Sequence, residues 1–477
     1  MTNNTEHHRW PRRRLGEFFR IKHGYAFKGE YFSNEGHFIV LTPGNFRADG
    51  GLVFKGEREK YYSADFPREY LLKKGEFLIV LTDLTQNAPI LGSPAFVPEN
   101  DRLLHNQRLG KITGLSSELD IHFLYYLLNT SGVRSQIKAT ATGATVRHTA
   151  PDRIYAVEAD IPPLAVQHRI ASILGAYDDL IENNLRRIRI LEEMVRLLYK
   201  EWFVDFRFPG HEKHGLRPAS NEACKPTRPN TPGWFPSPLG PIPTGWELIR
   251  LDAVAVVHRG RSYKSSELVE VGGLPFVNLK CIDRDGGFRY DGLKHYDGPF
   301  KDHHKVGRGD LVIAVTDMTQ ERRIVARVAR IPILDSPFGI ISMDLVKLQP
   351  VSPMSPTFIY GTLRYTRFPD EVKQYANGAN VLHLNPDRIT EWQFPCPSSE
   401  LITDYSSLAE NVYQEMDLLV KKNAVLRQTR DLLLPKLISG QVAVEDKEAQ
   451  PEVVIGRAAE EPTTYTSRKK GDCNARR

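Results

Sequence analysis

A long helix is predicted from the spacing of hydrophobic positions in residues 167–203. Apolar side chains recur there in alternating steps of four and three residues, which is the heptad pattern of a coiled coil rather than the wider stripe of an ordinary surface helix. One seam position, Asn184, is polar. At ~1.5 Å per residue, we expect a helix roughly 50 Å long. The apolar seam positions are Ile170, Leu174, Tyr177, Ile181, Ile188, Leu191, Val195, Leu198 and Trp202.

The chain contains a tandem repeat with a spacing of 234 to 236 residues. Residues 74–86 match residues 308–320, and both stretches combine a hydrophobic run with Thr-Asp-x-Thr-Gln. A second match aligns Gly143, Ala144 and His148 with Gly378, Ala379 and His383. Because the spacing is nearly constant over half of the chain, we interpret the pattern as a duplication.

Each repeat is predicted to begin with an α+β globular part. Hydrophobic runs at residues 38–41, 77–81 and 311–315 lie between turn-forming residues, as strands do, and residues 120–138 and 356–374 have the pattern of helical segments. Each repeat then ends in a long helix. The second helix is predicted at residues 402–437, and its seam is the first seam displaced by 235 residues, with Asn423 as a polar position.

We expect the two seams to pair in antiparallel orientation. This pairing places Ile170 beside Leu437 and brings Asn184 opposite Asn423, so that two buried amides satisfy each other and fix the register. The alternative is that each helix packs only on its own globular domain. The paired arrangement predicts a pseudo-twofold molecule with one globular domain at each end of the helix pair.

Composition is compatible with a nucleic-acid partner. The 477 residues are 41% hydrophobic and carry a net charge of +6, which permits DNA binding without being diagnostic of it. The four cysteines have no metal-ligand or redox spacing, and the chain shows neither a membrane span nor a signal peptide, so a cytoplasmic location is expected. Residues 207–243 are predicted to form a Pro-rich linker, and residues 441–477 a disordered tail.

Known catalytic patterns are missing from the sequence. It contains no Asn-Pro-Pro-aromatic motif of methyltransferases, and Gly110-Lys111 lacks the upstream glycine of a phosphate-binding loop. The acidic residues within 369–373 crowd on one helical turn, and His303-His304 lacks further ligands at metal spacing. We therefore predict no catalytic residue and no metal site.

The loops that follow the strongest strands are the candidate DNA contacts. Their Thr, Gln, Asn and His side chains can bond base edges, and their Arg and Lys side chains suit phosphates. The alternative is that these are ordinary polar loops. The candidates are Asn45, Arg47, Thr82, Thr85, Gln86, Asn87, Arg147, His148, Arg259, Arg261, Lys264, Asn278, Lys280, Thr316, Thr319, Gln320, Arg322, Arg323, Asn380 and His383.

Residues 161–171, Ile-Pro-Pro-Leu-Ala-Val-Gln-His-Arg-Ile-Ala, resemble a motif in the specificity (S) subunit of type I restriction–modification enzymes. Gly-Ala-Thr at residues 143–145 and Leu-Pro-Lys-Leu-Ile-Ser-Gly at residues 434–440 also match that family. The resemblance covers residues 10–440. The second helix departs from the pattern, because residues 394–398 lack the double proline and the glutamine that follows it.

The resemblance implies an α+β fold in which an antiparallel pair of long coiled-coil helices separates two target-recognition domains. The domains are expected at residues 1–160 and 244–398, the central conserved helix at 161–206 and the distal conserved helix at 399–440. It further implies a non-catalytic subunit that reads a bipartite, asymmetric target in double-stranded DNA. Two modification (methyltransferase) subunits and the restriction (translocase/nuclease) subunits are the implied partners, which would carry S-adenosylmethionine, ATP and Mg²⁺, with no cofactor in this chain.

Two other functions are compatible with the residues. One is a restriction enzyme with methylation or cleavage built into the chain. The other is a protein–protein scaffold or decoy that keeps the coiled-coil platform without specific DNA readout.

Overall fold

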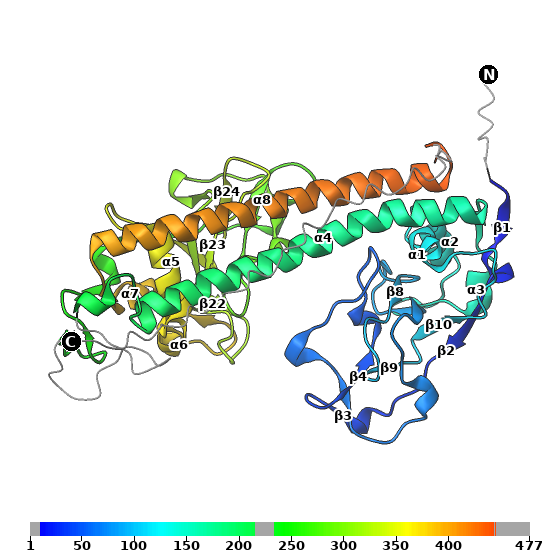
Figure 1. Cartoon of the computed structure of the whole chain (residues 1–477), viewed down its shortest axis with the longest axis horizontal. Helices are drawn as coiled ribbons and strands as arrows, with labels where there is room; N and C mark the ends of the chain where they lie inside the picture. Colours follow the sequence, from blue (N-terminus) through cyan, green and yellow to red (C-terminus); the bar gives the residue numbers. More distant parts are fainter. Residues whose placement is uncertain (1–9, 215–232, 443, 445–477) are drawn as a thin grey trace, which may run out of the picture. The chain divides into compact units, whose positions relative to one another are not determined.

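The computed structural model describes residues 10–214, 233–442 and 444 (Figure 1). Part of the predicted linker and most of the predicted tail lie outside these residues. By packing, the chain divides into two compact units, Met1–Leu174 with Leu432–Arg477, and Gly175–Asp431. None of the helices in the described part has the length and hydropathy of a membrane-spanning segment.

The first repeat folds mainly into two sheets. Its strands are β1 (Arg12–Arg14), β2 (Arg20–His23), β3 (Phe32–Ser33), β4 (Phe38–Leu41), β5 (Tyr61–Tyr62), β6 (Phe77–Val80), β7 (Thr82–Asp83), β8 (Pro94–Phe96), β9 (Leu103–His105), β10 (Leu109–Thr113), β11 (Arg147–His148) and β12 (Glu158–Asp160). One sheet has the order β2-β10-β6-β8 and the other β3-β5-β4-β9, while β1 pairs with β12 and β7 with β11.

The second repeat has the same strand order. Its strands are β13 (Trp234–Phe235), β14 (Ile242–Pro243), β15 (Glu247–Arg250), β16 (Ala255–Arg259), β17 (Leu268–Val269), β18 (Leu274–Val277), β19 (Lys294–Tyr296), β20 (Lys305–Val306), β21 (Leu311–Ala314), β22 (Thr316–Asp317), β23 (Val328–Arg330), β24 (Gly339–Ile341), β25 (Leu345–Pro350), β26 (Leu382–His383) and β27 (Gln393–Cys396). The sheets are β16-β25-β21-β23 and β17-β19-β18-β24-β20, so β20 is an addition at one edge. The duplication inferred from the sequence is therefore visible in the topology.

Strand β6 is the central strand of the first repeat because both of its faces are buried. Phe77 and Ile79 pack into one hydrophobic cluster with the helices, whereas Leu78 and Val80 pack into a second cluster with β4 and β9. Successive side chains of a strand point to opposite faces, so a strand covered on both sides needs an unbroken apolar run. Strand β21 divides its residues between two clusters in the same way.

Short helices cover one face of each central sheet. They are α1 (Ile121–Leu128), α2 (Ser131–Ala139) and α3 (Pro151–Tyr155) in the first repeat, and α5 (Pro356–Tyr365), α6 (Phe368–Val372) and α7 (Pro386–Thr390) in the second. Side-chain oxygens cap four of them: Asp120, Thr130, Ser355 and Asn385 each accept a hydrogen bond from a backbone N–H in the first turn.

The two long helices are α4 (Leu164–Tyr199) and α8 (Ser399–Ile438), each starting three residues before its predicted start. Residues Lys200–Val204 continue α4 as a π-helical turn. Gln167 explains the motif at the start of α4: its buried amide donates to the carbonyl oxygens of Glu118 and Pro162 and accepts from the Asp120 N–H. Ile402 occupies the equivalent position in α8 and is buried in a hydrophobic cluster instead.

Within the second unit, contacts between the helices run in antiparallel order. Asp178 pairs with Arg430 at 2.5 Å, and Asn184 Nδ2 donates to Asn423 Oδ1 at 2.8 Å. Asn423 Nδ2 also donates to the Ile181 carbonyl oxygen at 3.4 Å. Asn184 and Asn423 are 9% and 1% exposed, so the amide pair is buried. The predicted contact between the two amides is therefore present.

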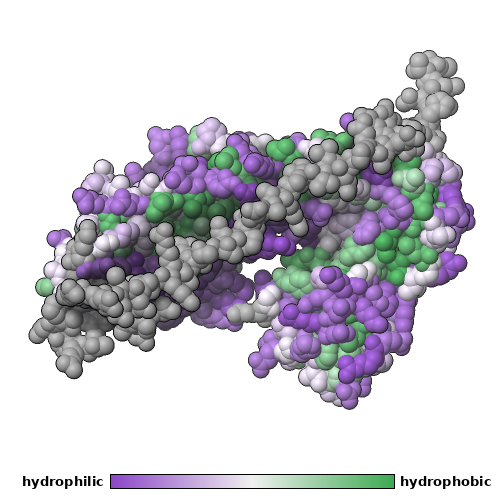
Figure 2. All heavy atoms as spheres, viewed as in Figure 1, coloured by the Kyte–Doolittle hydropathy of each residue, from purple (hydrophilic) through white to green (hydrophobic). Residues whose placement is uncertain are grey.

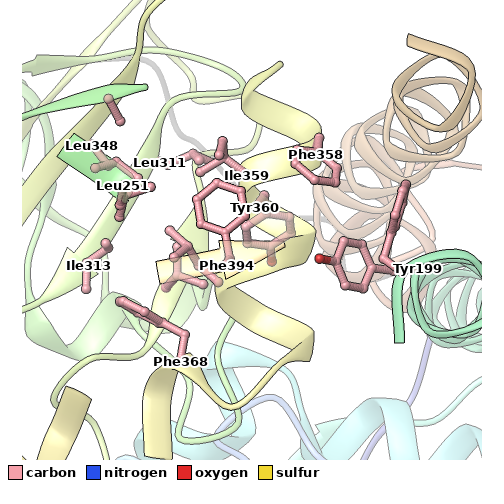
Figure 3. Packing of buried hydrophobic residues seen from close by; sticks show 14 of the residues in the cluster. Tyr199, Leu251, Leu311, Ile313, Leu348, Phe358, Ile359, Tyr360, Phe368 and Phe394 are labelled. Carbon is pink, nitrogen blue, oxygen red and sulfur yellow. The ribbon is translucent and has the colours of Figure 1, made fainter. Parts of the chain in front are cut away.

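Each long helix packs on both repeats, contrary to the alternative in which a helix packs only on its own domain. In the first unit, Leu437 of α8 lies in one hydrophobic cluster with Ile170 and Leu174 of α4 and with the core of the first repeat. In the second unit, Tyr199 of α4 lies beside Phe358 of α5 (Figure 3), and its hydroxyl donates to Thr362 Oγ1 at 2.9 Å.

Ion pairs attach α8 to the second repeat. Arg308 contacts Asp417 at 2.6 Å and Glu410 at 2.9 Å, and Arg330 contacts Glu410 at 3.1 Å and Asp417 at 3.7 Å. Asp417 is 5% exposed and Arg330 is 8% exposed. Burying one of these charges without its partners would be costly, so the two acids and two arginines form one interdependent cluster.

Candidate nucleic-acid interface

In the first repeat, the predicted site is a loop closed by a short ladder. Strands β7 and β11 pair antiparallel, and Thr82 Oγ1 lies 2.9 Å from His148 Nδ1 in a hydrogen bond. The carboxylate of the buried Asp83 accepts from the Thr85 N–H at 2.9 Å, the Thr85 hydroxyl at 2.8 Å and the Ile90 N–H at 2.8 Å. Asp83 therefore folds residues 82–90, which we call the first recognition loop.

The same arrangement recurs in the second repeat. Strands β22 and β26 pair Thr316 with His383, and Asp317 accepts from the Thr319 N–H and hydroxyl at 2.9 and 2.8 Å. It also accepts from the backbone N–H groups of Ile324 at 2.7 Å and Val325 at 3.2 Å. Burial raises the pKa of Asp317, but these hydrogen bonds outweigh it and the pKa is lowered overall, which keeps the carboxylate charged. Residues 316–325 are the second recognition loop.

A tight hairpin lies beside each recognition loop. Thr142 and His148 exchange backbone hydrogen bonds in the first repeat, as Asn377 and His383 do in the second. Gly143 has a φ of +99°, and a Cβ there would lie 1.9 Å from the Val146 carbonyl oxygen, so this position requires glycine. The repeated glycine in both halves thus has a structural cause.

Most predicted contact residues are exposed. Thr82 and Thr316 are buried at the base of the loops, Arg147, Arg261, Arg322 and Arg323 are half-buried, and Asn45 and Asn278 are buried. The exposed residues are Arg47, Thr85, Gln86, Asn87, His148, Arg259, Lys264, Lys280, Thr319, Gln320, Asn380 and His383.

Two of the predicted contact residues, Asn45 and Asn278, have side chains that face the protein interior. Asn45 is 1% exposed; its oxygen accepts from the Thr42 N–H at 3.0 Å and its amide donates to Glu59 at 2.9 Å. Asn278 is 6% exposed, accepts from the Lys280 N–H at 2.9 Å and donates to the Gly292 carbonyl oxygen at 2.8 Å. Both asparagines stabilise turns rather than facing solvent.

Three other candidates are already hydrogen-bonded within the second domain. Arg261 Nε donates to the Pro299 carbonyl oxygen at 2.9 Å, and Gln320 Nε2 donates to the Ala379 carbonyl oxygen at 2.8 Å. Arg322 donates to Gln374 at 2.9 Å. The Gln320 bond joins the second recognition loop to its hairpin, so these side chains would have to exchange partners to contact a base.

Arg134 is a functional candidate that the sequence did not single out. This residue of α2 is 8% exposed and donates to the carbonyl oxygens of Ala48 at 3.1 Å and Pro89 at 2.7 Å. Burial lowers the pKa of Arg134 to about 10, partly offset by Asp83 and Asp49. Because it joins residue 48 to the first recognition loop, Arg134 is a positioning residue for that loop.

Known proteins match the chain at the levels of family, sequence and fold. Residues 8–193 match the family described as type I restriction modification DNA specificity domain. The specificity subunit of restriction enzyme MjaIX from Methanocaldococcus jannaschii is 25% identical, over 68% of this chain and 69% of that protein. The HindI specificity subunit from Haemophilus influenzae is 21% identical, over 67% of this chain and 77% of that protein.

The fold also has a solved relative. The type I restriction–modification S subunit from M. genitalium matches with a TM-score of 0.51 and 16% identity, covering 92% of this chain and 98% of that one. Together, the duplicated fold and the matched domain define a DNA-specificity protein of a restriction–modification host-defence system. The comparisons support a specificity subunit of a type I restriction enzyme, which is the family that the motif at residues 161–171 predicted.

Proposed function

We propose that the chain reads a bipartite, asymmetric target in double-stranded DNA, one half with each repeat, and contributes no catalytic residue. The observation that carries this proposal is the duplicated site: Asp83 and Asp317 fold two recognition loops through equivalent hydrogen bonds. The exposed residues of the two loops differ, because Gln86 and Asn87 in the first correspond to Gln320 and a charged Glu-Arg-Arg run in the second. Equal frameworks with unequal side chains are suited to reading two different sequences.

In this proposal, the long helices bind the partner subunits. Each helix carries a second apolar stripe outside the seam, and Figure 2 shows hydrophobic residues interrupting the hydrophilic surface along the helices. The stripe residues are between 44% and 61% exposed and are Leu180, Ile190, Met194 and Leu197 on α4, and Leu408, Leu418, Val425 and Leu432 on α8. Such exposed apolar positions at helical spacing suit a partner helix.

The two stripes are related by the repeat. Ile190 and Leu197 correspond to Val425 and Leu432 at the 235-residue spacing. Equivalent surfaces on two helices support two copies of one partner, which we propose are the modification (methyltransferase) subunits, with the restriction (translocase/nuclease) subunits joining them. S-adenosylmethionine, ATP and Mg²⁺ belong to those partners in this proposal, and the assembly acts in the cytoplasm.

The test is to map methylated adenines made by the complex of this chain with its modification subunits. We expect one split sequence with two unlike halves. Exchanging residues 1–150 for those of a relative should change one half and leave the other intact. A change in both halves would refute the assignment of one half to each repeat.

A footprinting experiment separates this function from a scaffold or decoy. The same complex should protect its methylated sequence on duplex DNA and retain that preference as salt is raised, although total affinity falls. Binding that depends on salt but shows no sequence preference would contradict the proposal. Methyl transfer by the purified chain alone would contradict the absence of a catalytic site.

A further inference from the structure

Two turns at equivalent positions of the repeats have the same backbone and different exposed side chains. Residues 106–109 join β9 to β10, and residues 342–345 join β24 to β25. Apart from the final leucine, Asn-Gln-Arg-Leu and Ser-Met-Asp-Leu share no residue. We call these segments the paired turns.

Hydrogen bonds within the paired turns are equivalent. The fourth residue donates its N–H to the carbonyl oxygen of the first, at 2.9 Å from Leu109 and at 3.0 Å from Leu345. The side-chain oxygen of the first residue accepts from the N–H of the third: Asn106 from Arg108 at 2.9 Å, and Ser342 from Asp344 at 3.4 Å. Asparagine and serine can both form this turn, so its shape survives the change of sequence.

Contacts to the neighbouring loops are equivalent as well. Gln107 donates its N–H to the Tyr25 carbonyl oxygen at 2.9 Å, and Met343 donates to that of Arg261 at 2.8 Å. At Gly24, a Cβ would lie 2.2 Å from the Asn106 carbonyl oxygen. Glycine is needed there because the two backbones approach so closely, and each turn is therefore held at a fixed position.

The paired turns lie directly beside the recognition loops. Leu81 donates its N–H to the Arg108 carbonyl oxygen, and Val315 donates to that of Asp344, both at 2.9 Å. The next residue in each case is the threonine that begins the recognition loop. A ligand bound by the exposed side chains of the turn would therefore lie next to a ligand bound by the recognition loop.

The side chains at these positions differ in chemistry. Gln107 and Arg108 are exposed, and within the described residues their side chains form no hydrogen bond or ion pair. Met343 is apolar and 51% exposed. The third residue of the turn is Asp344 in the second repeat, and its carboxylate accepts a hydrogen bond from Thr316 at 3.1 Å. In the first repeat the equivalent threonine, Thr82, is hydrogen-bonded to His148 instead. The recognition-loop threonine therefore has a different partner in each repeat.

We propose that the paired turns are specificity-determining elements at which the two half-sites diverge. Gln107 reads an adenine through its amide donor and acceptor, and Met343 contacts the methyl group of a thymine. Arg108 contacts the adjacent phosphate or guanine. This inference rests on the proposed function, because it identifies which residues of each repeat select the base.

The test uses the full chain in complex with its modification subunits. Gln107→Ala should relax one adenine in one half-site, lowering discrimination there about tenfold or more. Gln107→Glu, which keeps the size but removes the amide donor, should shift the preference at that position toward cytosine. Met343→Gln should alter only the other half-site. Asn34→Ala is the matched control, since Asn34 is an exposed amide directly after β3, and β3 lies at the opposite edge of its sheet from β9, the strand that leads into the turn.

Sequencing of methylated adenines gives distinct outcomes. A change confined to one position of one half-site, with the Asn34→Ala motif unchanged, supports the inference. If Gln107→Glu and Met343→Gln fold and methylate the wild-type sequence with unchanged discrimination, the turns do not select bases, although the proposed function stands. If the wild-type complex methylates no defined sequence, the proposed function itself fails.

Discussion

Replacing Asn184 and Asn423 with leucine, singly and together, should reveal a strong coupling between the two positions. Each single replacement removes the 2.8 Å hydrogen bond and leaves one buried amide without that partner. An unsatisfied buried amide costs about 1–3 kcal/mol, and the double variant contains none. The stabilisation gained by burying each apolar leucine side chain occurs in both the single and the double variants, so it cancels in the coupling energy. The cycle should therefore give a coupling energy of about 2 kcal/mol or more.

Urea unfolding followed by tryptophan fluorescence measures this coupling. Four of the five tryptophans, Trp202, Trp234, Trp246 and Trp392, lie in the unit Gly175–Asp431 that contains the amide pair. Asn411→Leu is the control, because Asn411 is exposed on α8 and its replacement should change the free energy of unfolding by under about 0.5 kcal/mol.

Additive single effects would refute the reasoning, since they would show that the amides do not depend on each other. Crosslinking provides an independent check of register. Cysteines placed at positions 184 and 423 should crosslink more efficiently than cysteines at 184 and 416 or 184 and 430. A preference for either of the shifted pairs would place the seam one heptad away from the arrangement described here.

Three further predictions concern other parts of the chain. Ile190→Asp on α4 and Val425→Asp on α8 should each weaken binding of one modification subunit, so that the mass of the purified complex falls by one copy. If both copies remain bound, the apolar stripes are not the binding surfaces for these subunits. Asp317→Asn should weaken readout of one half-site about tenfold, since an amide cannot accept all the bonds that fold the loop; an unchanged footprint would count against this. Burial lowers the pKa of His105 from 6.5 to about 4, so as the pH falls the unfolded chain is protonated at this residue before the folded chain is. The free energy of unfolding should fall by about 3 kcal/mol from pH 6.5 to pH 4, and a slope unchanged in His105→Gln would contradict this cause.

The periodic features could be predicted from the sequence. A heptad seam and a nearly constant repeat spacing are regular patterns, so the long helices, the amide contact and the duplicated recognition loops follow without knowledge of packing. The polar seam residue was informative because Asn184 interrupts an otherwise apolar row, and Asn423 is polar at the equivalent position of the second helix.

Individual side-chain contacts were harder to predict from the sequence, because the burial of a side chain depends on packing between segments that are distant in the sequence. Asn45 has the composition of a base-reading residue, yet its amide is used inside a turn. Arg134 reads as a surface residue of a short helix, and only the arrangement of the segments around it buries its guanidinium. The paired turns share a backbone but only one residue type, so no sequence repeat marks them.

The ion cluster between α8 and the second repeat restricts how this protein can evolve by recombination. Where the second repeat has Arg308 and Arg330, the first has Lys74 and Phe96. A first-position domain transplanted into the second position would thus keep a lysine in place of Arg308 but put Phe96 in place of Arg330, which removes one buried cation partner of Asp417 and should destabilise the packing of α8. We therefore expect domains to be exchangeable between related chains at the same position, whereas exchange between the two positions of one chain should need compensating changes in α8. The two halves are duplicates in ancestry but no longer interchangeable parts.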